Sequence, residues 1–161
     1  MPESFDVRKI RLATDLLKEL DDVLAGGEIA RKTSSTGGVH VTWSKRYSKR
    51  AGLCRSQYAA IDCKIDDEVY QRNLKLYGHA EDRVKIRTTK YNIRLAEKLV
   101  TDEKRLMDVV AHEWCHLAAS ALSGVSNDKH GSWFWYWAEQ VHKHFAHRGI
   151  KVTKCHDYLV K

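Results

Sequence analysis

The chain has 161 residues, of which 43% are hydrophobic and 30% are charged, and its formal net charge is +7. This length predicts a single domain, residues 1–161, with a core that needs no disulfide staples. The lack of any run of about eighteen apolar residues excludes a membrane-spanning helix, and the first residues lack the pattern of a secretory signal. The basic charge favours an anionic partner, most often a nucleic acid, although solubility alone would also explain it.

The first third of the chain is expected to form one helix followed by two strands. Apolar residues recur at helical spacing over residues 6–25, which predicts a packing helix without chemistry of its own. Residues 39–43 alternate in polarity as a half-buried strand does. The basic turn 44–50 leads to a second expected strand at 51–55, so we expect the two strands to pair as an antiparallel hairpin. Gly52 within this strand indicates a bulge or a close backbone approach.

The middle of the chain is less regular. Residues 62–82 are polar and are expected to form an insertion or mobile loop with one helical turn or more. The stretch 84–95 alternates as a strand, but the phase of its alternation shifts by one residue between Thr88 and Tyr91. A bulge within one strand, or two short strands, would produce that shift. We expect this stretch to be an edge strand that could hold an extended peptide.

The last third of the chain is expected to contain two helices. Thr101, followed by two acids, is a good helix start, and Gly124 is a good helix end. Ser132 begins a final helix that runs to about residue 146, and a short strand is expected at 150–153. The order of helix, small antiparallel sheet, helix and helix predicts the α+β class.

The sequence His112-Glu113-Trp114-Cys115-His116 lies inside the first of these two helices. Residues four apart project from one face of a helix, so the two imidazoles can close on one metal ion while Glu113 can reach a water held by that metal. At the frequencies of histidine and glutamate in this chain, one such match arises by chance roughly three per cent of the time. The interpretation of this motif as a metal site therefore depends on the residues around it.

A catalytic zinc usually takes three protein ligands and keeps one position open. His130 is the best candidate for the third ligand, because it begins the next helix after a tight loop and is followed by a glycine. Glu139 remains an alternative, but it lies more than two helical turns from His130 and shows no partnering acid pattern. The cysteines form no C-x-x-C pair, so we expect reduced thiols and no second zinc site from local pairs: Cys54, Cys63, Cys115 and Cys155.

These residues predict metal-assisted amide hydrolysis with one catalytic Zn²⁺ as the cofactor. Zinc lowers the pKa of a bound water toward about 7 and polarises the scissile carbonyl. Glu113 is the expected general base, which accepts the proton of that water and can pass it to the departing amine.

Two further groups of residues are candidates for contact with nucleic acid. The densest basic cluster either contacts phosphates or is a solvated hairpin tip: Lys45, Arg46, Lys49, Arg50 and Arg55. Trp133 and Trp135 either pack in the fold or stack on unpaired bases. We expect at least two of Trp133, Trp135 and Tyr136 to pack.

Three stretches resemble the SprT-like metalloprotease domain family. They are Trp43-Ser44-Lys45-Arg46 with Ala51-Gly52-Leu53-Cys54, then Ile93-Arg94-Leu95-Ala96-Glu97-Lys98-Leu99, and His130-Gly131 with Cys155-His156-Asp157-Tyr158. Matched position by position, the resemblance implies His112, His116 and His130 as zinc ligands and Glu113 as the catalytic base. It also implies a zincin-like fold, in which a small antiparallel sheet packs on helices around a central H-E-x-x-H helix, with a catalytic core at about 39–158.

The family resemblance further implies a DNA-dependent protease of the nucleus that degrades proteins bound or covalently crosslinked to DNA, as in DNA–protein crosslink repair. Its expected DNA partner is single-stranded or has unpaired regions. Many relatives carry a cysteine-based zinc ribbon after the stretch that matches 155–158, so we expect this chain to be an excised catalytic domain. Two alternatives stay open: a DNA-binding module whose zinc is structural, and a zinc peptidase without any DNA dependence.

Overall fold

The computed structural model describes residues 3–125 and 129–154 and has an α+β architecture. Its elements in chain order are α1 (Phe5–Ala25), α2 (Glu28–Thr33), η1 (Ser34–Thr36), β1 (His40–Ser44), β2 (Gly52–Lys64), α3 (Asp67–Tyr77), β3 (Arg83–Ala96), α4 (Glu103–Ala121), α5 (Ser132–Phe145) and η2 (Ala146–Arg148). The three long helices α1, α4 and α5 lie where the apolar spacing predicts them. The described residues contain no helix that is both long and apolar enough to cross a membrane.

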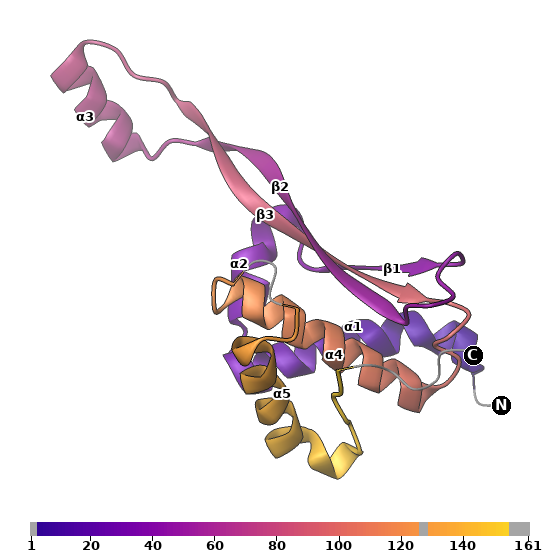
Figure 1. Cartoon of the computed structure of the whole chain (residues 1–161). Coiled ribbons are helices and arrows are strands. Elements are labelled where there is room, and N and C mark those ends of the chain that lie inside the picture. Colours follow the sequence, from indigo (N-terminus) through magenta and orange to yellow (C-terminus); the bar gives the residue numbers. More distant parts are fainter. Residues whose placement is uncertain (1–2, 126–128, 155–161) are drawn as a thin grey trace.

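Helix α4 is the centre of the structure. It packs against α1 and α5 and lies below the sheet (Figure 1). Its buried residues are distributed around the whole helix, from Leu106 to Ala119, which is the pattern of a helix enclosed on all sides. Its N-cap is Asp102 and not Thr101, since the Asp102 carboxylate accepts the Arg105 N–H at 2.8 Å. The rigid centre of the domain is therefore the helix that carries His112 and His116.

The sheet is mixed, and the prediction of a small antiparallel sheet is wrong. Its strand order is β1-β3-β2, with β1 parallel and β2 antiparallel to β3. The predicted hairpin of residues 39–43 with 51–55 does not form, because β3 lies between the two strands. Parallel pairing places Val41 beside Ile93 and Trp43 beside Leu95, so the apolar side chains of both strands share the face that covers the helices.

The strand next to the H-E-x-x-H helix is β2, which is an edge strand. The predicted edge strand at residues 84–95 is instead the central strand where the sheet covers the helices. At the end of β2 that lies over α4, a Cβ atom added to Gly52 would meet Val109 Cγ1 at 2.9 Å and Glu113 Cγ at 3.0 Å. The close approach expected at Gly52 is therefore confirmed, and it brings the edge of the sheet into contact with α4.

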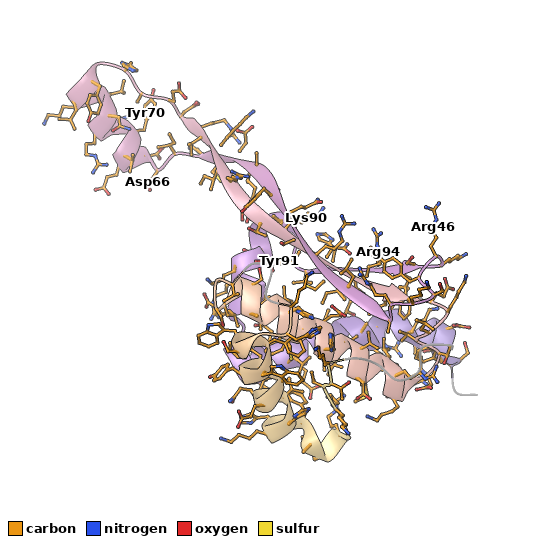
Figure 2. The ribbon with its side chains drawn as sticks, in the orientation of Figure 1. Arg46, Asp66, Tyr70, Lys90, Tyr91 and Arg94 are labelled. Carbon is orange, nitrogen blue, oxygen red and sulfur yellow. The ribbon has the colours of Figure 1, made fainter. Side chains whose placement is uncertain are left out.

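Beyond the helices, β2 and β3 continue as a two-stranded arm that ends in α3 (Figures 1 and 2). Their register is unbroken from the Gly52–Leu95 pair to the Lys64–Arg83 pair, so the predicted bulge is absent. The shift of phase instead marks the point where the apolar residues of β3 change from one face of the sheet to the other. Tyr91 is buried on the helix side, where its hydroxyl forms a hydrogen bond with the Ser120 hydroxyl. Ile86 lies on the opposite face and is 48% exposed. Helix α3 replaces most of the expected irregular loop.

Removal of the outer arm is expected to leave the rest of the fold intact. None of the residues 61–86 is buried, so they contribute little to the core. We predict that a variant in which an Asn-Gly turn joins Ala60 to Arg87 changes the Tm by less than about 5 °C. Circular dichroism during heating measures this change.

The matched comparison is Leu20→Ala, which empties a fully buried position in α1. That variant should lose about 2–5 kcal/mol of stability. Loss of cooperative unfolding in the arm-deleted protein would contradict the prediction.

Candidate metal centre

The side chains of His112, His116 and His130 converge between α4 and the start of α5. Their potential ligand atoms all lie within 4.8 Å of one another. The ring centroids are 5.0 Å apart for His112–His116 and His112–His130, and 4.8 Å apart for His116–His130. The expected pairing of two histidines one helical turn apart with a third from the next segment is therefore present in space. These three residues could hold a metal ion.

The geometry of this cluster fits a tetrahedral metal ion. The Nε2 atoms of His112 and His130 are 3.2 Å apart. Two nitrogen ligands on a tetrahedral zinc, with Zn–N bonds of about 2.0–2.1 Å, lie about 3.3 Å apart. Three imidazoles leave a fourth position free, which is the donor set of a catalytic and not of a structural zinc site. Glu113 is not a member of the cluster, so the donor set contains no carboxylate.

The orientation of His112 is fixed by a backbone carbonyl far away in the sequence. His112 Nδ1 lies 2.7 Å from the carbonyl oxygen of Thr153, which can only accept a hydrogen bond. Nδ1 must therefore carry the proton, and the Nε2 lone pair of the neutral imidazole points toward the other two histidines. Sequence reasoning missed this contact, because a carbonyl acceptor has no residue-type signal. The strand expected at 150–153 is absent from the described residues, and this segment crosses His112 instead.

His130, which lies just before α5, and Phe134 on α5 complete the site. His130 has a φ of 67°, a left-handed conformation that only this non-glycine residue adopts among the described residues. Such strain is tolerated where the surrounding structure requires it, often at functional sites. The fully buried Phe134 ring lies 5.0, 4.6 and 4.7 Å from the rings of His112, His116 and His130, so it forms an apolar floor under the cluster. The spacing of residues in the sequence gives no sign of this contact with the three histidines.

The carboxyl group of Glu113 is buried against the edge strand. The Cys54 N–H donates a hydrogen bond to it, and a Cβ atom on Gly52 would lie 3.0 Å from its Oε1. Burial raises the pKa of the Glu113 carboxyl to about 8, while the hydrogen bond from Cys54 and the positive charge of Arg50 oppose this shift. Strand β2 therefore determines both the position and the proton affinity of this side chain.

The predicted nucleic-acid residues lie on different parts of the structure. Lys45, Arg46, Lys49 and Arg50 lie between β1 and β2, and Arg55 lies on β2. Trp133 and Trp135 lie on α5, on the side of α4 away from the sheet (Figure 1). Trp133, Trp135 and Tyr136 are 42%, 41% and 45% exposed, so the expectation that at least two of them pack in the fold is wrong.

Three other histidine and cysteine side chains have structural surroundings outside the metal centre. Cys115 is fully buried and is not a member of the histidine cluster. His142 Nε2 accepts the Val152 N–H, and His40 Nε2 lies 2.9 Å from the Thr36 carbonyl, so each has a structural partner. The stretch 155–158, which carries the last part of the family resemblance, lies outside the described residues.

Comparison with known proteins agrees with the resemblance. The model of the SprT-like family matches residues 13–156. The chain is 25% identical over 156 residues to an HMG box-containing protein of Schizosaccharomyces pombe, a match that covers 97% of this chain and 37% of that protein. It is 23% identical over 123 residues to the human germ cell nuclear acidic protein, a match that covers 76% of this chain and 14% of that protein.

The chain thus spans well under half the length of both relatives. The family match, by contrast, includes all four residues of the candidate centre and extends from the middle of α1 to beyond the last described residue. The chain therefore belongs to the SprT-like family.

Proposed function

We propose that this chain is a zinc-dependent endopeptidase domain of the zincin type. The observation that carries the proposal is the convergence of three imidazoles beside a buried glutamate. Two of the imidazoles and the glutamate lie on α4, and the third lies just before α5. Membership of a family of metalloprotease type supports the same reaction class. In this proposal His112, His116 and His130 are the zinc ligands and Glu113 is the general base.

A zinc ion in this position would supply a water of lowered pKa and would polarise the scissile carbonyl. The protein's own residues prepare the site for it. The Thr153 carbonyl holds the His112 tautomer, and Phe134 excludes water from one side of the cluster. Glu113 accepts a proton at its carboxylate, which the Cys54 N–H orients. Its raised pKa suits a group that must hold that proton and then release it to a leaving amine.

An extended segment of polypeptide is the substrate that the surroundings of the site favour. Because β2 is an edge strand, part of its backbone is open to pairing with an added strand. The Cys54 N–H points away from β3 toward Glu113, so neighbouring backbone groups on this edge lie next to the proposed base. A peptide paired with β2 would pass the site in an extended form.

We further propose that the substrates are proteins bound or crosslinked to DNA, that single-stranded or partly unpaired DNA stimulates the reaction, and that the protein works in the nucleus. The net charge of +7 and the basic residues between β1 and β2 support an anionic partner. The names of the two relatives, with an HMG box in one and a nuclear acidic protein in the other, support a nuclear, DNA-associated role.

Glu113→Gln is expected to retain zinc but to reduce cleavage of a DNA-binding protein substrate by at least about 10²-fold, because the amide cannot accept the proton. Substrate cleavage is followed on gels with and without single-stranded DNA, and zinc content is measured by mass spectrometry. The control is Glu139→Gln, an exposed acid on α5 that should cleave as the parent does. Equal cleavage by Glu113→Gln and the parent would exclude this mechanism.

The same assay separates the two alternatives. Zinc binding without cleavage by the parent, in the presence of DNA and of any substrate tried, would favour a DNA-binding module with a structural zinc. Cleavage at the same rate with and without DNA would favour a peptidase that has no DNA dependence.

His130→Ala is expected to lose zinc, because it removes one of only three ligands. We predict about one zinc per chain in the parent and far less in the variant after dialysis against a chelator of moderate strength. His144→Ala, which removes an exposed histidine of the same helix, is the control. Retention of zinc by His130→Ala at the level of the control would show that another residue is the third ligand.

Gly52→Ala is expected to displace Glu113 without removing any proposed ligand. The added methyl group would meet Val109 and Glu113 at 2.9–3.0 Å, so we predict a loss of about 1–3 kcal/mol in stability and a cleavage rate that falls by up to about 10²-fold. Zinc content should be unchanged. The double variant Gly52→Ala, Val109→Ala makes room for the methyl group and should recover part of the stability. Additive losses in the double variant would be evidence against this steric explanation.

A further inference from the structure

Where the sheet lies over α1 and α4, one of its faces packs on these helices. No described helix covers the opposite face, which we call the outer face. The helices lie on one side of the sheet, and Arg46, Lys90 and Arg94 project on the other side (Figure 2). The register explains this arrangement. Tyr91, Ile93 and Leu95 are buried toward the helices, so the residues that alternate with them on β3 face outward.

Side chains from β2 and β3 line a pocket on this outer face. They are Arg55, Gln57, Lys90, Asn92 and Arg94. Arg55 pairs with Asn92 and Gln57 pairs with Lys90 in the antiparallel register, so the five side chains form one continuous group. The pocket contains three cations and no carboxylate.

The three cations lack an internal counter-charge. None of them forms an ion pair with a carboxylate in the part of the chain that the structure describes. The nearest outward neighbours in the register are His40 and Thr42 on β1, Leu53 on β2 and Thr88 on β3, none of which is acidic. Lys90 and Arg94 are half-buried, which weakens the screening of their positive charges by water. A bound anion would supply the counter-charge that the neighbouring side chains do not provide.

The neutral side chains in the pocket also favour an acceptor-rich ligand. The Thr42 hydroxyl donates a hydrogen bond of 3.1 Å to Asn92 Oδ1. The group that Asn92 presents to a ligand is therefore its NH₂, a donor. Two guanidinium groups, an ammonium group and amide NH₂ groups together match the oxygens of phosphate, which only accept hydrogen bonds.

The cations extend over more than one phosphate. Lys90 and Arg94 are four residues apart on one strand, which is about 13 Å. The basic turn that carries Lys45, Arg46 and Lys49 continues the positive charge beyond Arg94, since Ser44 and Gly52 pair with the end of β3. A linear polyanion fits this extended surface better than a single phosphate ion does. No apolar side chain that could anchor in lipid lines the pocket.

We propose that the outer face of the sheet, formed by Arg55, Gln57, Lys90, Asn92 and Arg94, binds the sugar-phosphate backbone of a nucleic acid. The inference rests on the proposed function and deepens it, because it assigns the DNA contact to residues of β2 and β3 outside the basic turn. It also separates this contact from Trp133 and Trp135, which lie on α5.

The position of this surface relates DNA binding to substrate choice. Gly52 and Cys54 of β2 contact Glu113 on the helix side of the sheet, whereas Arg55 and Gln57 of the same strand face outward. A nucleic acid on the outer face would hold an attached protein next to the edge strand that adjoins the metal centre. The protein would then select substrates because they are attached to the same nucleic acid that it binds, and not by their peptide sequence.

The test is the triple variant Arg55→Gln, Lys90→Gln, Arg94→Gln of the whole zinc-loaded chain. Binding of a fluorescein-labelled single-stranded oligothymidine is measured by fluorescence anisotropy at several salt concentrations. We expect affinity to fall by about tenfold or more, and the slope of log K against log salt to decrease by about two, since three phosphate contacts are removed.

The control is Lys32→Gln, Lys143→Gln, Lys151→Gln, which removes the same charge from exposed positions outside the sheet. It should change affinity far less than the test variant does. Equal losses in both triple variants would overturn the proposal, because they would reflect net charge alone. Unchanged affinity and salt slope in the test variant, at an unchanged Tm, would also overturn it.

Two further arms identify the ligand. Binding of the parent to phosphatidylserine vesicles but not to the oligonucleotide, or to inorganic phosphate alone, would overturn the proposal in favour of another anion. None of these measurements depends on cleavage. A parent that binds DNA through this surface yet cleaves nothing would therefore refute the proposed peptidase and leave this inference standing.

Discussion

The contact between the Gly52 backbone and helix α4 is the constraint on which the geometry of the candidate site depends. Any side chain at position 52 would meet Val109 and Glu113 at 3.0 Å or less, so only glycine lets the edge strand come this close. The close approach brings the Cys54 N–H to the Glu113 carboxyl and excludes water from it. Burial then raises the proton affinity of that carboxyl, while one hydrogen bond and the charge of Arg50 limit the increase. Packing between a strand and a helix thereby sets the acid–base property of a proposed catalytic residue.

The histidine cluster depends on contacts among three segments. His112 and His116 come from the enclosed helix α4, His130 comes from the left-handed residue before α5, and the orientation of His112 comes from the Thr153 carbonyl. Phe134 contacts all three rings, so movement of α5 relative to α4 would disturb the whole cluster. This dependence links metal affinity to the packing of the two helices. Binding of a metal would in turn stabilise the arrangement of α4, α5 and the segment that crosses them.

The two faces of the sheet differ in their surroundings, because successive side chains of a strand point to opposite faces. Toward the helices, Ile93 and Leu95 complete the core, and at the edge Cys54 contacts Glu113. Toward solvent, the residues between them are cationic or amide side chains without acidic neighbours. In the arm formed by the outer parts of β2 and β3, no described helix covers the strands. There the apolar residues of β3 lie on the face opposite to that of Tyr91, Ile93 and Leu95. The alternation of polarity along β3 therefore follows which face is covered, and it shifts without any change in register.

Features that depend on local spacing could be predicted from the amino-acid sequence. These include the three long helices, the pairing of His112 with His116 on one helix face, and the close approach at Gly52. His130 could also be proposed as the third ligand, because a glycine and a helix start follow it and the family resemblance implies the same residue. Other features became evident only in the tertiary structure. They include the pairing of β1 with β3, the edge position of β2 and the carbonyl that orients His112. The grouping of Arg55, Lys90 and Arg94 on one surface is another. Each of these joins residues far apart in the chain, and strand pairing is set by the apolar face that the whole fold buries and not by any local pattern.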